Sequence, residues 1–307
     1  MHGSDSEKPF YSTRLPWLLV AALIVALAAQ YWLSRAPGKP GDTATAETQR
    51  PIRFRLALPD GVSVAESRSP AVAIAPQNDQ IVFQGTSQGT THLYRQRIDA
   101  LEATVIAGTA GATDAAFSPD GKALAFYADG VLQRISVDGG IASPLAQAAN
   151  PRGLTWGADD NIYLSPVNNA GISRLPARGG KLETVTSLAD GQLSHRWPQL
   201  SADGSALIYT VWNDNGWSNT QIMWHPLDGS PAREIAKGGG FARHIAGADG
   251  RELLIFVNEQ TLLSAPIERS GNTITVGRAE PRLDSLFTNL SGGAHLAVSP
   301  SGSMVYL

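Results

Sequence analysis

The sequence contains no cysteine, and only 17% of its 307 residues carry a charge. Without cysteine the protein can form neither disulfide bonds nor thiolate metal sites, although such a protein is viable on either side of a membrane. A net charge of −3 gives no electrostatic reason to expect a nucleic-acid partner, because nucleic-acid binding needs a basic surface. Glycine, with 31 residues, exceeds its usual share of about 7%, and this favours short strands and tight turns over helices.

A short apolar run, a tight turn and a second apolar run recur six times along the chain. The clearest copy covers residues 117–126 and reads Phe-Ser-Pro-Asp-Gly-Lys-Ala-Leu-Ala-Phe. Degenerate copies cover residues 74–83, 156–163, 200–209, 246–256 and 298–306. The copies follow one another at intervals of 39 to 52 residues. A period of about 40–45 residues with strand-like content is typical of the blades of a β-propeller.

The repeats predict an all-β, six-bladed type of β-propeller with five complete blades and a partial sixth. The innermost strands are expected to begin near Ala71, Asp114, Pro151, Arg196 and Ala242, with the partial blade starting near Ala294. In the second blade, Asp129-Gly130 has the composition of a hairpin turn that needs positive φ. Residues 52–58 alternate apolar and polar side chains, and we expect them to close the ring as the outer strand of the last blade. The chain stops in mid-blade, which suggests a truncated propeller.

Residues 15–34 have the composition of a transmembrane helix. The run from Leu15 to Leu33 is interrupted only by Gln30, and at 1.5 Å per residue it spans about 28 Å. Trp17 and the pair Tyr31-Trp32 stand where aromatic residues meet the membrane interfaces. The sequence therefore predicts a short tail at 1–14, a helix at 15–34, a flexible linker at 35–50 and the propeller at 51–307.

Two features of this N-terminal segment remain open from the sequence. Ala26-Leu27-Ala28 offers a small-x-small site, so a cleaved signal peptide is the rival to an uncleaved anchor. Basic residues lie on both sides of the apolar run, and the export of a large domain depends little on such charges. The charges therefore do not determine the orientation in the membrane. We expect a single-pass protein of a bacterial inner membrane, with the propeller on the periplasmic side.

The Ser-Pro-Asp-Gly repeats resemble those of TolB-type propeller blades. Three further segments, at residues 150–156, 194–198 and 238–243, are similar to the extracytoplasmic C-terminal region of membrane-anchored bacterial serine/threonine protein kinases. In that family a cytoplasmic kinase domain precedes one transmembrane helix, and the propeller follows it. Only fourteen residues precede the predicted helix here, so the resemblance implies the sensor-like half without a kinase domain.

Several local motifs could carry chemistry. Residues 85–89 match the G-x-S-x-G pattern of a serine nucleophile, but the segment that follows reads as a strand rather than the helix this motif requires. The six histidines are dispersed and match no zinc motif. Residues 212–219 are rich in oxygen ligands but lack calcium-loop spacing, and a hairpin turn is the simpler interpretation. We therefore expect no catalytic residues, no metal and no cofactor.

The candidates for ligand binding are His195, Arg196 and Trp197. They enter the inner strand of the fourth blade, and arginine and tryptophan often dominate binding surfaces. The alternative is that they serve packing between blades, with Trp197 in the core. The sequence as a whole favours a non-enzymatic, membrane-anchored propeller that binds a protein or an envelope ligand. A detached sensor half of a receptor-type kinase is the alternative, and an enzyme built on the propeller face comes third.

Overall fold

The computed structural model describes residues 55–307, apart from 65–69, 214–215, 248, 271–272 and 290. The chain divides into two compact units, 1–55 and 56–307, and the described residues belong almost entirely to the second. Their regular structure consists of strands and one short 3-10 helix, η1 (Trp217–Asn219), so the predicted all-β fold is confirmed. The predicted tail at 1–14, the helix at 15–34 and the linker at 35–50 lie outside the described residues. Within the described ranges, no helix has the length and apolar character needed to cross a membrane.

The strands form antiparallel sheets, each made from one continuous stretch of chain. The first sheet contains β1 (Ser63–Val64), β2 (Val72–Ile74), β3 (Gln80–Ser87), β4 (Thr90–Arg97) and β5 (Thr104–Val105). The second contains β6 (Thr113–Phe117), β7 (Ala123–Ala128), β8 (Val131–Ser136) and β9 (Ser143–Gln147). The third contains β10 (Leu154–Trp156), β11 (Asn161–Leu164), β12 (Ser173–Pro176) and β13 (Glu183–Thr184).

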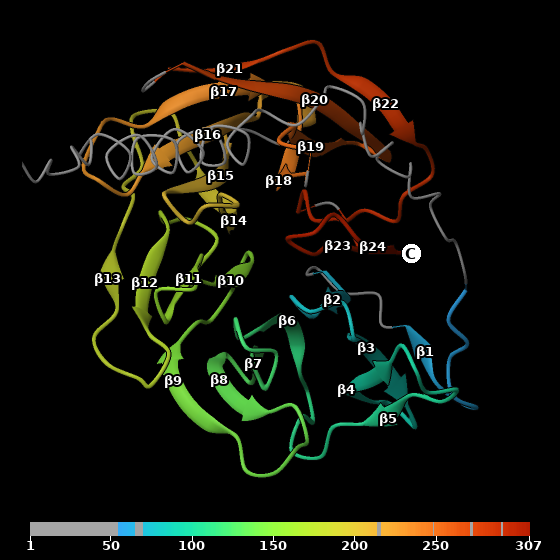
Figure 1. Ribbon diagram of the computed structural model, residues 1–307. Helices are drawn as coiled ribbons and strands as arrows, with labels where there is room; N and C mark the ends of the chain where they lie inside the picture. Colours follow the sequence, from blue (N-terminus) through green and yellow to red (C-terminus); the bar gives the residue numbers. More distant parts are fainter. Residues whose placement is uncertain (1–54, 65–69, 214–215, 248, 271–272, 290) are drawn as a thin grey trace, which may run out of the picture. The chain divides into compact units, whose positions relative to one another are not determined.

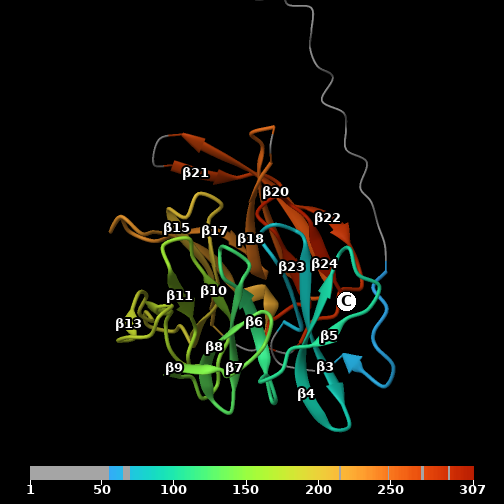
Figure 2. The ribbon, with the colours of Figure 1, turned by 60° about the horizontal axis from the view of Figure 1, so that its bottom comes forward.

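Three further sheets continue this order. The fourth contains β14 (Ser194–Leu200), β15 (Ala206–Trp212), β16 (Gln221–Pro226) and β17 (Arg233–Lys237). The fifth contains β18 (Gly240–Ala246), β19 (Glu252–Asn258), β20 (Thr261–Ser270), β21 (Thr273–Val276) and β22 (Glu280–Leu283). The sixth pairs β23 (Leu296–Val298) with β24 (Met304–Tyr306). The long ribbon of β20 and β21 projects from the fifth sheet (Figure 2).

The sheets are arranged in a ring around a common axis, and their innermost strands are β2, β6, β10, β14, β18 and β23 (Figure 1). Along the chain, β2 contacts β6, β6 contacts β10, β10 contacts β14, and β14 contacts β18. The fifth and sixth sheets share one apolar cluster, which includes Phe241 and Leu296, and β23 returns to contact β2. These inner strands begin within a few residues of the positions predicted from the repeats. The ring is therefore closed by contacts between consecutive sheets.

The apolar second strand of a sheet packs against neighbours on both of its faces. In β7 all six residues are buried. Leu124 and Phe126 belong to a cluster shared with the first sheet, while Ala125 and Tyr127 belong to a cluster shared with the third. Because successive strand residues point to opposite faces, a strand buried on both sides must be apolar throughout. The radial packing of sheets thus follows from the uninterrupted apolar runs of the repeats.

The turn predicted at Asp129-Gly130 is confirmed. It joins β7 to β8 with φ of 53° at Asp129 and 74° at Gly130. Two consecutive positive φ values are those of a type I′ hairpin turn, whose twist matches that of the paired strands.

The predicted role of residues 52–58 in closing the ring is wrong for the part that the structure describes. Residues 55–58 form no strand, and the strand that follows them, β1, pairs with β3 of the first sheet rather than with the last sheet. Residues 52–54 lie outside the described residues. The physical reason is apolar packing, because Val62, just before β1, packs against the cluster of Val72, Phe83 and Tyr94 in the first sheet.

A buried histidine joins the sixth sheet to the first instead. The Nδ1 atom of His295 accepts a hydrogen bond of 3.1 Å from the backbone N–H of Ala71. The ring of His295 is fully buried and meets the ring of Phe287 edge-on at 4.8 Å. Burial lowers the pKa of His295 to about 4, because the charged imidazolium loses its hydration.

His295→Asn is expected to make the stability of the protein less sensitive to acid. In the unfolded wild type, His295 has its ordinary pKa of 6.5, whereas in the folded protein its pKa is about 4. The unfolded state therefore binds more protons between these values, and stability is lost as the pH falls through this range. An asparagine keeps an acceptor for the Ala71 N–H and does not titrate. The fall in melting temperature between pH 6.5 and 4 should shrink by a few degrees in circular-dichroism melts. The same change at the partly exposed His92 is the control, and an unchanged slope in His295→Asn would contradict this account.

Candidate functional site

Three inner strands carry a bulge where a bulky or charged residue adopts positive φ. Asp114 has φ of 49°, Trp197 of 56° and Phe241 of 54°. The register of each inner strand with its neighbour shifts at these points, between Thr113 and Ala115, between Arg196 and Gln199, and between Gly240 and Arg243. A bulge changes the direction of nearby side chains, and positive φ at tryptophan or phenylalanine is an outlier that cores rarely keep without a reason. Such strain gathers at functional sites, so the side chains beside these residues are the first candidates for a site.

A charged side chain lies in or next to the inner strand of each of four sheets. Asp114 comes from the second sheet, Arg152 from the segment that leads into β10, Arg196 from β14 and Arg243 from β18. We call these four residues the central charged cluster. The second and fifth sheets lie on opposite sides of the ring (Figure 1), yet Asp114 and Arg243 influence each other's pKa. Arg152 likewise lowers the pKa of Arg196. The four side chains therefore form two interacting pairs, Asp114 with Arg243 and Arg152 with Arg196.

Arg196 is held in place on three sides. Its Nε–H donates to Ser194 Oγ at 2.6 Å, and Nη1 donates to the carbonyl of Ser291 at 2.9 Å. The guanidinium carbon lies 4.5 Å from the centre of the Trp212 ring. Burial, followed by repulsion from Arg152, lowers the pKa of Arg196 to about 10, so the side chain stays charged at neutral pH. Its remaining N–H groups make no hydrogen bond to the described residues.

Arg243 has a similar arrangement on the neighbouring sheet. Its guanidinium carbon lies 4.0 Å from the centre of the Phe241 ring, and Nη1 donates to the carbonyl of Ala242 at 2.9 Å. The side chain keeps some contact with solvent, but the protein surrounds it closely enough for burial to lower its pKa to about 10, against the opposing influence of Asp114. Arg243 therefore also remains positively charged at neutral pH.

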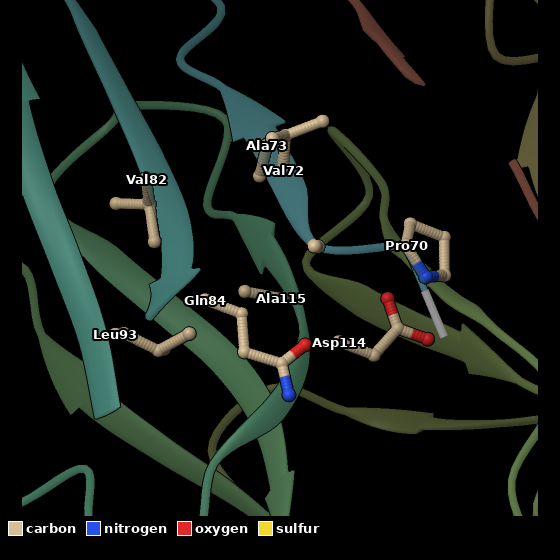
Figure 3. A pocket seen from close by; sticks show the side chains of 9 residues that line it. Pro70, Val72, Ala73, Val82, Gln84, Leu93, Asp114 and Ala115 are labelled. Atoms are coloured by element: carbon tan, nitrogen blue, oxygen red, sulfur yellow. The ribbon is translucent and has the colours of Figure 1, made fainter. Parts of the chain in front are cut away.

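Asp114 is only 4% exposed, and its Oδ2 atom has no hydrogen-bond partner among the described residues. Burial raises the pKa of Asp114 to about 8, although Arg243 opposes this shift. At neutral pH this carboxyl is consequently mostly protonated and uncharged. A narrow hollow lies beside it, lined by Pro70, Ala71, Gln84 and Ala115 among others (Figure 3).

The binding candidates His195, Arg196 and Trp197 are separated by the fold. Only Arg196 joins the central charged cluster. His195 is buried between the third and fourth sheets, where Nδ1 lies 2.7 Å from Thr186 Oγ1 and Nε2 lies 2.9 Å from Gln192 Oε1. Burial lowers the pKa of His195 to about 4, which suits a neutral structural residue.

Trp197 lies in the apolar core that joins the fourth, fifth and sixth sheets. Its ring meets that of Phe241 edge-on at 5.6 Å and is 1% exposed. Of the two interpretations of Trp197, ligand binding and packing between blades, its position matches packing between blades.

The sequence analysis missed Asp114, Arg152 and Arg243 as functional candidates. For the arginines a signal was available, because each of the three segments 150–156, 194–198 and 238–243 contains one arginine. These arginines stand at the start of successive inner strands. Aligning the repeats on the arginine rather than on the Asp-Gly turn would have given Arg152, Arg196 and Arg243 equivalent places in three successive repeats.

The motifs at residues 85–89 and 212–219 lie between paired strands, as the sequence predicted. Residues 85–89 form the turn between β3 and β4, with φ of 49° at Gln88 and 77° at Gly89, and a strand follows rather than a helix. Of residues 212–219, Trp212 ends β15 and residues 217–219 form η1 shortly before β16, the strand that pairs with β15. Across the described ranges, no group of three or more histidine, aspartate or glutamate side chains is arranged to hold a metal ion.

The ring of antiparallel sheets defines the fold of this protein as a β-propeller. Its structure is similar to TolB from Acinetobacter baumannii, with a TM-score of 0.54 and 16% identity over 71% of this chain and 56% of that one. It is also similar to a protein assigned as TolB in Agrobacterium tumefaciens, with a TM-score of 0.53 and 15% identity over 76% of this chain and 87% of that one.

A third similar structure belongs to an enzyme. Oligogalacturonate lyase from Vibrio parahaemolyticus has a TM-score of 0.51 and 12% identity over 77% of this chain and 73% of that one. At such identities these similarities show the fold alone. No model of a protein family matches the sequence, and the search of curated proteins finds no match.

Proposed function

We propose that this protein is a six-bladed, non-enzymatic propeller that binds another protein through the centre of its ring. The observation that supports this most is the central charged cluster, in which two arginines of inner strands, Arg196 and Arg243, are each held by hydrogen bonds and an aromatic ring. Arginine and aromatic side chains in well-packed surroundings are the usual anchors of protein interfaces. A ring of packed sheets also holds its inner residues in fixed positions, which suits recognition.

We further propose that residues 15–34 anchor the propeller to a bacterial inner membrane and that the propeller is periplasmic. The apolar run and its aromatic flanks support the anchor. Alkaline phosphatase fused after Leu307 is expected to be active in intact cells, because this enzyme works only after export. An inactive fusion that is nevertheless present in the membrane fraction would contradict the periplasmic location.

A role as the detached sensor half of a receptor-type serine/threonine kinase is a narrower form of the same proposal. It is supported by the sequence resemblance of residues 150–156, 194–198 and 238–243. In that case a kinase encoded next to this protein would be the signalling partner.

Protein binding is tested by panning a library of random dodecapeptides against the purified full-length chain in detergent. Selected peptides are expected to bind in isothermal titration calorimetry, and scrambled versions are not. The same chain is then mixed with oligogalacturonate, because a lyase with a similar fold acts on that sugar. Formation of an unsaturated sugar product, with no peptide selected, would favour an enzyme over a binding module.

A further inference from the structure

We propose that the protein partner docks on one particular end of the ring, the end at which the inner strands begin, and that it does so through apolar rather than charged side chains. This inference rests on the proposed protein-binding function. It adds the end that the partner contacts and the chemistry of the contact. Arg196 and Arg243 lie among the first four residues of their inner strands, β14 and β18, and therefore belong to this end.

Backbone hydrogen bonds show which turns share an end of the ring. In the second sheet, the connection to the next sheet meets the turn between the second and third strands, where the N–H of Ala148 donates to the carbonyl of Gly130 at 2.8 Å. At the opposite end, the N–H of Val137, after the third strand, donates to the carbonyl of Lys122, in the turn between the first two strands, at 3.0 Å. The fourth sheet repeats both kinds of bond, from Gly238 to Thr220 and from Leu227 to Ser205.

The end at which the inner strands begin carries few charges. Its turns and connections, which we call the charge-poor end, are residues 88–89, 109–112, 129–130, 148–153, 165–172, 186–193, 213–220, 238–239, 259–260 and 286–295, with 214–215 and 290 left out. The charged side chains among these described residues are Asp129, Arg152, Asp190 and Glu259.

The opposite end has the composition of an ordinary solvated surface. Its turns, which we call the charge-rich end, are residues 75–79, 98–103, 118–122, 137–142, 157–160, 177–182, 201–205, 227–232, 247–251 and 299–303, with 248 left out. Every one of these turns except 299–303 carries at least one charged side chain. The two ends of the ring are therefore suited to different surroundings.

Large apolar side chains at the charge-poor end are partly exposed. Leu193 is 49% exposed, Phe287 is 47% exposed, and Trp217 is also in partial contact with solvent. The ring of Trp217 meets that of Trp212 edge-on at 5.8 Å, and the guanidinium of Arg196 lies over Trp212. Depletion of charged residues, together with enrichment in aromatic residues and arginine, is the composition of the centre of a protein interface. This end therefore has the composition of a docking surface.

The charge-rich end exposes an apolar side chain in a different setting. Leu101 is 98% exposed, and in the sequence it stands between Asp99 and Glu102, which are both exposed. A single apolar residue among charges is normal on a protein surface. Leu101 is therefore a matched control for Leu193.

An apolar contact suits the charge-poor end better than an ion pair does. Arg152 and Arg196 are only 6% and 9% exposed, so an acidic side chain of the partner would have to be buried to reach them. Burying a charge removes its hydration, and the loss is offset only by a closely placed opposite charge. Apolar side chains that cover Leu193 and Trp217 lose no such hydration, and their burial is favourable.

The test uses a peptide selected by panning, the full-length chain in detergent and titration calorimetry. Leu193→Asp is expected to weaken binding at least tenfold, because it places a charge within the apolar contact. Leu101→Asp makes the same change at the charge-rich end and should leave the affinity unchanged. Ser218→Asp, at an exposed residue beside Trp217, should also weaken binding, and it keeps the test valid if Leu193→Asp folds poorly. Circular-dichroism melts show whether each variant is folded.

A second measurement leaves the protein unchanged. Raising the sodium chloride concentration from about 50 mM to about 500 mM should change the affinity less than threefold, because salt screens charges and leaves apolar contacts in place. Replacing the apolar residues of the peptide one at a time with aspartate should reproduce the tenfold loss at one or more positions.

Weaker binding by the folded Leu193 or Ser218 variant, with unchanged binding by Leu101→Asp, supports the proposal. Two results would each overturn it while the protein-binding function stands. One is an affinity that Leu101→Asp lowers as much as the variants at the charge-poor end do, or that none of the three changes lowers. The other is a tenfold fall in affinity at high salt. Failure to select any peptide would overturn both the proposal and the protein-binding function.

Discussion

Trp197→Ala is expected to lower the free energy of unfolding by about 3–5 kcal/mol, the usual range for removing a large buried aromatic side chain. Trp197 is among the largest fully buried side chains in the described part of the chain. Its ring packs against Phe241 of the fifth sheet, and a side chain added at Gly153 or at Gly293 would collide with it. One residue therefore fills space between four sheets, and its removal leaves a cavity that glycines cannot fill.

The measurement is chemical unfolding followed by circular dichroism at neutral pH. Trp217→Ala is the control, because Trp217 packs against the same apolar cluster but is partly exposed. The control should lose clearly less stability than Trp197→Ala. Equal losses in the two variants would show that Trp197 has no special role in joining the sheets.

Asp114→Asn is expected to stabilise the protein at pH 8 and to have little effect at pH 4. The folded protein keeps a proton on Asp114 up to about pH 8, whereas the unfolded chain releases it near pH 3.8. The folded state therefore binds more protons than the unfolded state between these values, and stability falls as the pH rises through this range. Asparagine removes that loss, which amounts to at most about 6 kcal/mol for a shift of this size.

Asparagine also tolerates the backbone conformation at this position, since aspartate and asparagine both adopt positive φ more readily than other residues with a side chain. Asp129→Asn makes the same change at another positive-φ position, φ 53°, in an exposed turn. In thermal melts at pH 8, the Asp114 variant should unfold on the order of 10 °C above the wild type. The Asp129 variant should match the wild type. A melting temperature for Asp114→Asn that falls with pH as steeply as that of the wild type would contradict a protonated Asp114.

The repeats were sufficient to predict the all-β fold and the start of each inner strand. This was possible because Asp-Gly turns and apolar runs are local signals that recur in a fixed order. Asp129-Gly130 forms the expected turn since few other residue pairs accept two positive φ values. The pairing of residues 52–58 was not predictable in the same way. An alternating pattern indicates a strand but does not say which sheet edge offers the better apolar contacts.

The candidate site was only partly predictable for a related reason. Residues 195–197 are adjacent in sequence, but at the bulge in β14 Arg196 contacts Trp212 and Ser291 whereas Trp197 enters the apolar core. Asp114 and Arg243 are far apart along the chain and approach each other only because their sheets face each other across the ring. The composition and spacing within a single repeat do not indicate which residues of distant repeats lie near each other.

The most direct measurement of the central claim is a crystal structure of the protein with a selected peptide bound. The account predicts that the peptide lies at the inner strands and contacts Arg196 or Arg243. A peptide bound only at the outer strands, with neither arginine in contact with it, would contradict it.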